Sequence, residues 1–127
     1  MGKKVQQWLD RVEYDLQTAE AMFEAGRYVY VIFMCQQAVE KCLKAVVVSQ
    51  GGEVVPIHNL RRLAELASVT FDADKLIKLD FLSEYYINSR YKEDLAELSK
   101  GLNRDFAQDI LVFSKEVVGW LIQGIKS

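Results

Sequence analysis

One stretch of the chain, residues 28–48, constrains the fold more than any other feature. Its sequence YVYVIFMCQQAVEKCLKAVVV is apolar except for a single polar stripe. A helix would gather on one face the four residues of this stripe, which are spaced by three and four: Gln37, Glu40, Lys41 and Lys44. A helix that is apolar on most sides is normally a central member of a helical bundle. The charges on this helix therefore need partners, water in a groove, or a ligand.

The other segments show the same helical periodicity, without strand-like alternation or internal repeats. We predict helices over residues 4–25, 27–50, 59–68 and 73–90, and a last helix capped by Asn103. Residues 92–101 read as an exposed, partly helical connection. We expect a single domain over residues 1–127 that is all-α, an up-and-down four-helix bundle with a short additional helix.

Composition and cysteine placement narrow the classes of partner and the cellular compartment. With 16 Lys and Arg against 18 Asp and Glu, the net charge of −2 argues against a broad basic surface for nucleic acid. The chain opens without a secretory signal, and no apolar run approaches the roughly 18–20 residues that span a bilayer. Cys35 and Cys42 are seven residues apart on one predicted helix, about 10.5 Å in rise, which is too far for a disulfide. We expect free thiols, a cytoplasmic location and no membrane partner.

The sequence offers no pattern for a metal or a cofactor. Di-iron bundles have two Glu-x-x-His motifs, whereas this chain has one histidine, His58, with Val55 in place of the glutamate. Neither a Cys-x2-Cys zinc pattern nor a glycine-rich phosphate loop of the P-loop or dinucleotide type is present. We therefore expect no metal site and no cofactor.

Several sequence blocks, taken together and in order, resemble the HEPN domain family. The blocks are Trp8 with Tyr14-Asp15-Leu16 and Ala19; Tyr28-x4-Phe33-x2-Gln36-Gln37-Ala38-x-Glu40-Lys41-x-Leu43-Lys44-Ala45; Pro56-x-His58-x-Leu60; and Tyr86-x3-Arg90-Tyr91. The resemblance implies a helical bundle that usually forms a dimer. It also implies a setting beside small nucleotidyltransferases in prokaryotic toxin–antitoxin or defence modules. Members of the family are either RNA-cleaving toxins or proteins that bind a nucleotide or a partner.

The residues that carry ribonuclease chemistry in such toxins are missing here. Ribonuclease members resemble one another in an Arg-x4–6-His motif, whose Arg stabilises phosphate charge and whose His moves a proton. The three positions at that distance after Arg90 hold no His, and the three before His58 hold no Arg. Glu97 falls at one of these positions and could act as a base, but nothing in the sequence demands that role. The sequence therefore favours a protein that is not an enzyme.

Two interpretations stand for the polar stripe. Glu40 and Lys44 form an i,i+4 pair in the favourable orientation, which indicates a structural or dimer-interface salt network. Lys41 has Gln37 four residues earlier, so pairing within the helix explains only part of the stripe. The alternative is a ligand-binding face, and we rank it second.

The other candidate residues lie outside the stripe and also have two interpretations each. For His58, we prefer a ring that fixes its loop against the bundle over a ligand contact. Arg90 suits either the C-terminal end of a helix or a phosphate or carboxylate ligand. Tyr86 and Tyr91 are typical of core or interface, or of stacking on a base.

These patterns lead to three functional hypotheses. The first is a non-catalytic, dimeric HEPN-like protein that serves as partner subunit of a nucleotidyltransferase-type protein and binds a nucleotide. The alternative is an RNA-cleaving toxin with a divergent active site around Arg90, His58 or Glu97. The third is a purely structural bundle subunit without a small ligand.

Overall fold

A computed structural model describes residues 2–91 and 95–127, apart from the side chains of Arg90 and Tyr91. Within these residues the chain forms six helices and no strand. Their bounds are α1 Lys3–Glu24, α2 Tyr28–Ser49, α3 Leu60–Leu66, α4 Ala73–Tyr91, α5 Leu95–Ser99 and α6 Arg104–Lys126. The prediction of an all-α fold is confirmed.

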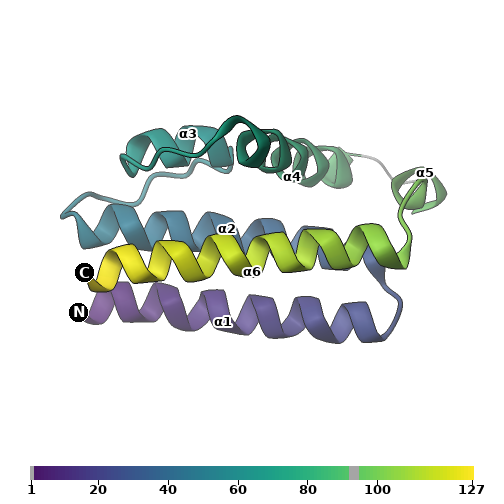
Figure 1. Cartoon of the computed structure of the whole chain (residues 1–127), viewed down its shortest axis with the longest axis horizontal. Helices are drawn as coiled ribbons and strands as arrows, with labels where there is room; N and C mark the ends of the chain where they lie inside the picture. The colour runs from purple at the N-terminus through teal and green to yellow at the C-terminus, as the bar shows by residue number, and fades with distance from the viewer. Residues whose placement is uncertain (1, 92–94) are drawn as a thin grey trace.

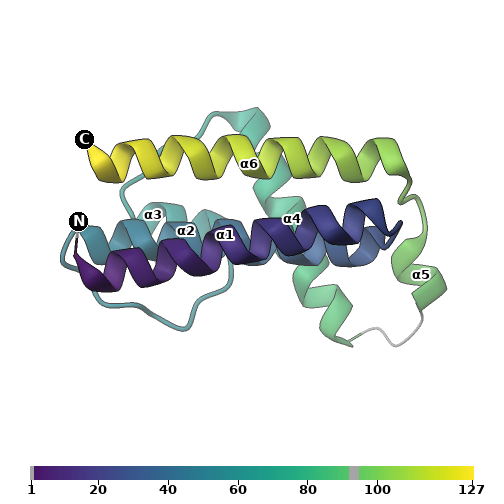
Figure 2. The same ribbon diagram turned by 90° about the horizontal axis from the view of Figure 1, so that it is seen from below.

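Three long helices, α1, α2 and α6, run along the long axis of the molecule (Figure 1). Helix α1 runs antiparallel to α2 and α6, and the two ends of the chain lie at the same end of the structure (Figure 1). Helices α3 and α4 form a layer on the side of α2 away from α1, and α4 crosses the long helices at a steep angle (Figure 2). Helix α2 packs against every other described helix, so it is central, as its apolar composition predicts.

The predicted helix boundaries agree with the structure to within about two residues. Gly26 and Gly51 follow α1 and α2 with φ of 72° and 84°, a left-handed conformation that favours glycine. Asp72 accepts a hydrogen bond from the backbone N–H of Lys75 (2.9 Å) at the start of α4. The predicted partly helical connection contains α5, and its first three residues, 92–94, lie outside the described residues.

Both cysteines of α2 are fully buried and free, as predicted. Burial raises the pKa of the Cys35 thiol to about 11 and that of Cys42 to about 12. At neutral pH both side chains are therefore small apolar groups of the core. None of the helices described is both long enough and apolar enough to cross a membrane.

Candidate functional site

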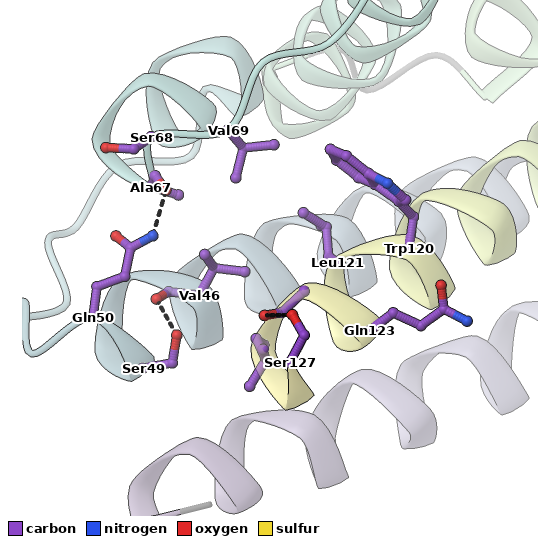
Figure 3. Close-up of a pocket in the computed structure, with 12 residues that line it drawn as sticks. Val46, Ser49, Gln50, Ala67, Ser68, Val69, Trp120, Leu121, Gln123 and Ser127 are labelled. Atoms are coloured by element: carbon purple, nitrogen blue, oxygen red, sulfur yellow. Dashed lines mark hydrogen bonds between the residues drawn. The ribbon is translucent and has the colours of Figure 1, made fainter.

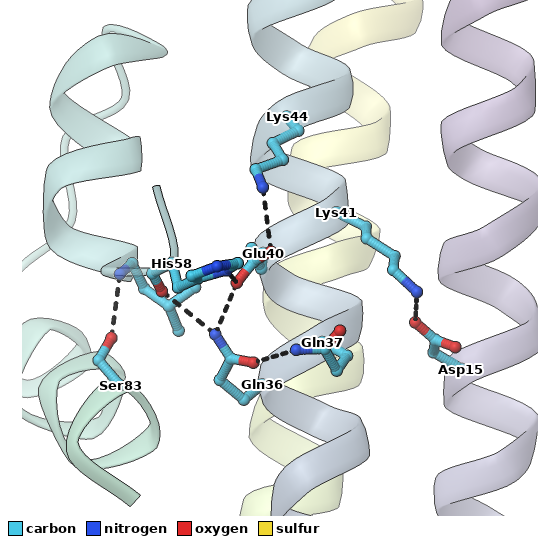
Figure 4. Close-up of polar contacts among 9 residues, drawn as sticks. Asp15, Gln36, Gln37, Glu40, Lys41, Lys44, His58 and Ser83 are labelled. Atoms are coloured by element: carbon cyan, nitrogen blue, oxygen red, sulfur yellow. Dashed lines mark hydrogen bonds and ion pairs between the residues drawn. The ribbon is translucent and has the colours of Figure 1, made fainter. Parts of the chain in front are cut away.

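Two regions of the structure concentrate features that a binding protein would use. One is a groove near the ends of α2 and α6 (Figure 3), which contains none of the residues singled out from the sequence. The other is the polar stripe of α2, which holds four of those residues and is seen in Figure 4 with α6 behind it. The residues of the stripe contact two different parts of the chain, helix α1 and the segment that leads into α3, which flank α2 on opposite sides (Figure 4).

The carboxylate of Glu40 is the centre of the first cluster, and only 4% of this residue is exposed. Its Oε1 accepts a hydrogen bond from Gln36 Nε2 at 3.0 Å and lies 3.0 Å from His58 Nδ1. Its Oε2 accepts from Lys44 Nζ at 3.1 Å. A buried carboxylate requires such partners, because an isolated charge in the interior is costly. The i,i+4 pair predicted from the sequence is therefore confirmed, and it is buried.

The cluster also holds the segment that leads into α3. Gln36 Nε2 donates a second hydrogen bond to the backbone carbonyl of His58 at 3.2 Å. The His58 ring packs against Tyr86, with centroids 5.5 Å apart, and Tyr86 in turn stacks on Phe33 at 5.2 Å. The backbone N–H of Leu60 donates to the Ser83 hydroxyl at 3.0 Å. These contacts agree with the preferred interpretation of His58, although 43% of its side chain stays exposed.

Lys41 belongs to a second, separate contact on the other side of α2. Its Nζ lies 2.6 Å from Asp15 Oδ2 of α1, and only 7% of the Asp15 side chain is exposed. Gln37 lies between the two clusters and donates to Gln36 Oε1 at 2.8 Å. The partner that Lys41 lacks within its own helix is thus supplied by α1.

Two residues of this network, Gln36 and Asp15, were not among the candidates chosen from the sequence. A signal for Asp15 was present, because it is the one polar residue in the buried stripe of α1. Gln36 gave a weaker signal, as an amide next to Gln37 within an otherwise apolar run. Both side chains connect α2 to residues at least 22 positions away along the chain.

The candidates do not all meet at one site. Lys41 lies on the α1 side of α2, whereas His58 and Glu40 lie on the side of α3 and α4 (Figure 4). Arg90 and Tyr91 end α4, and their side chains are outside the described part of the chain. Tyr86 is buried against His58, as expected of a core aromatic residue. The observed network can neutralise its charges internally and hold three elements together.

Comparison with known proteins identifies relatives of the whole chain. The family model of the HEPN domain matches residues 5–125. The crystal structure of ST0689, an archaeal HEPN homologue, is 26% identical with a TM-score of 0.78, over 98% of this chain and 99% of that one. That of TT1696 from Thermus thermophilus is 23% identical with a TM-score of 0.80, over 96% and 98%. The second similarity shows the fold alone. A search of the curated proteins finds no match.

Proposed function

This chain belongs to the HEPN domain family, and from that premise we propose that it is a non-catalytic, dimeric member that acts as a binding subunit. Its partner in this proposal is a nucleotidyltransferase-type protein of a prokaryotic toxin–antitoxin or defence module, with a nucleotide as a further ligand. The Arg-x4–6-His spacing of the ribonuclease members is absent from the sequence.

The observation that carries this proposal is that the charged residues of the polar stripe are paired with other residues of the same chain. Glu40 is engaged by Gln36, Lys44 and His58, and Lys41 is engaged by Asp15. Binding a ligand through these groups would require breaking contacts that keep buried charges paired, which is costly. The stripe therefore supports a role in holding the bundle in shape, with partner recognition left to the surrounding surface.

The outer side of α1 and α2 is the surface that we assign to the partner. Tyr14 of α1 is 72% exposed and lines the same surface pocket as Lys41. Tyr30 of α2 is 55% exposed and lies on the helical stripe that continues through Gln37 to Lys41. Exposed tyrosines favour an interface, because they bury much apolar area and keep a hydrogen-bonding group. A second copy of the chain is the first partner proposed for this face.

Light scattering on the purified protein tests the proposal, together with incubation of the protein with RNA. We expect a dimer that leaves RNA intact, and we expect Tyr30→Glu to shift the dimer toward monomer. Val112→Glu is the matched control, because Val112 on α6 is 49% exposed, close to the value for Tyr30, and lies outside this face. A wild-type monomer, or a Val112→Glu variant that dissociates as readily as Tyr30→Glu, would contradict the assignment.

One observation favours the alternative, an RNA-cleaving toxin with a divergent site. The Glu40 carboxylate fixes Nδ1 of a half-exposed His58, and a carboxylate commonly orients a histidine in this way for proton transfer. If this alternative holds, expression of the protein arrests growth and His58→Ala removes the effect. Wild-type protein that neither arrests growth nor cleaves RNA eliminates it.

A further inference from the structure

A groove near the C-terminal ends of α2 and α6 is separate from the polar network of α2. Its volume is about 610 Å³, within the roughly 300–1,000 Å³ of small-molecule sites. The end of α2, the segment after α3 and the last turns of α6 form its walls (Figure 3). Gln50 joins two of these walls, because its Nε2 donates to the Ala67 carbonyl at 2.7 Å. This hydrogen bond fixes the end of α2 to the segment after α3 on one side of the groove.

The groove combines an apolar floor with uncharged polar groups. Its apolar lining includes Val46, Val69 and Leu121, and its polar lining includes Gln50 and Gln123. No side chain among the described residues that line it is charged. An anionic ligand would therefore find no cation to pair with.

One wall of the groove is an exposed tryptophan. Trp120 is 53% exposed, although a tryptophan is usually highly buried. Its indole packs on Phe71 with centroids 5.5 Å apart, which holds the ring in place. The face of an indole is negative, so it attracts cations as well as aromatic rings.

The C-terminal ends of two helices are a second source of negative electrostatic potential at the groove. Helix α2 ends at Ser49 and α6 at Lys126, and the groove is lined by Ser49 of α2 and by Gly124 and Ile125 in the last turn of α6. The C-terminal end of a long helix carries about half a negative charge, which comes from its aligned peptide dipoles. At the end of α2 the carbonyls of Val46, Val47 and Val48 accept hydrogen bonds from the backbone that follows the helix, so the dipole, and not a set of free carbonyls, supplies the negative potential there. Lys126, the cation of the last turn of α6, lines a different pocket beside α1. Helix α2 has no basic residue in its last turn, so its negative end at the groove is not neutralised by a side chain of its own.

We propose that this groove binds a small organic cation with an aromatic or aliphatic body. The body lies on the apolar floor against Trp120, and the ammonium group faces the ends of α2 and α6. The volume fits a small molecule, and the uncharged side chains offer an anion no counter-charge. The indole face and the helix ends are the two features that favour a cation. The site is independent of the partner-binding face proposed above.

Three probes with the same ring and different charge test the proposal: tryptamine, indole and indole-3-acetate. Binding is followed by the shifts of backbone amide resonances in NMR spectra of the ¹⁵N-labelled protein. We expect tryptamine to bind about threefold or more tightly than indole, and indole-3-acetate to bind about threefold or more weakly. The shifted amides should belong to the last turns of α2 and α6.

Two glycines of α6 provide a matched pair of variants. Gly124 lines the groove, whereas Gly119 does not, and a Cβ added at either glycine meets no atom within 4 Å. Gly124→Leu should abolish tryptamine binding by filling the groove, while Gly119→Leu should leave binding unchanged. Both variants should melt no lower than the wild type, because leucine favours a helix more than glycine does. Loss of binding in Gly124→Leu therefore cannot be attributed to unfolding.

The charge preference is tested at the rim by Gln123, which is exposed. Gln123→Glu should tighten tryptamine binding, and Gln123→Lys should weaken it. The proposal is overturned if tryptamine shifts no groove amide at about 10 mM. It is also overturned if the acetate binds as tightly as the amine, or if Gly124→Leu binds like the wild type.

Discussion

Removing the carboxylate of Glu40 should destabilise the fold far more than removing an exposed charge does. The Lys44 ammonium lies 3.1 Å from this carboxylate, and their side chains are 8% and 5% exposed. At that separation the attraction is about 5 kcal/mol for an effective dielectric constant of about 20, much of it offset by desolvation. Glu40→Ala leaves Lys44 buried without its counter-charge, so we expect a loss of about 3–5 kcal/mol in the free energy of unfolding.

A double-mutant cycle separates the charge pair from the rest of the cluster. In the Glu40→Ala background, Lys44→Met removes the unpaired ammonium and should restore about 2 kcal/mol. The remaining loss comes from Gln36 and His58, which no longer have the Glu40 acceptor. Urea unfolding at pH 7, followed by circular dichroism, measures all four proteins.

An exposed ion pair is the control for this measurement. Arg61 and Asp80 are joined by a 2.7 Å contact, with side chains 45% and 39% exposed, and Arg61→Ala should cost less than about 1 kcal/mol. The reasoning is refuted if Glu40→Ala costs no more than Arg61→Ala. It is also refuted if Lys44→Met adds to the loss instead of reducing it.

Three further predictions concern other parts of the molecule. Ser68 has a φ of 55° after α3, so Ser68→Gly should raise the free energy of unfolding by about 0.5–1 kcal/mol in the same assay. Asn103 accepts from the backbone N–H of Phe106 at 2.8 Å, and Asn103→Ala should lower the melting temperature through a loss of about 1 kcal/mol. The pKa values of Cys35 and Cys42 are raised to about 11 and 12 from 9.0. The stability linked to these thiols is therefore fully present below pH 9 and is lost as the pH rises toward 11 and 12, because the unfolded chain releases the protons first. Urea unfolding at pH 8 and pH 10.5 should show this loss, and the Cys35→Ala/Cys42→Ala variant should show less of it.

The helices could be predicted because their signals are local. Apolar residues at spacings of three and four define the buried faces, and Gly26, Gly51, Asp72 and Asn103 mark helix ends within the same turn of chain. The Glu40–Lys44 contact was predictable for the same reason, since residues four apart are neighbours on any helix.

The sequence by itself therefore determined the all-α class, the bounds of the long helices, the central place of α2 and the pair within it. The tertiary structure decided the partner of Lys41, which is Asp15 of α1, and brought His58 to Glu40. It also formed the groove beside Trp120. His58 and Glu40 are 18 positions apart in the chain, and Lys41 and Asp15 are 26 apart. The groove brings together residues that are farther apart still, such as Val46 and Trp120. Local spacing cannot set such distances, because they depend on the crossing angle and the relative sliding of packed helices.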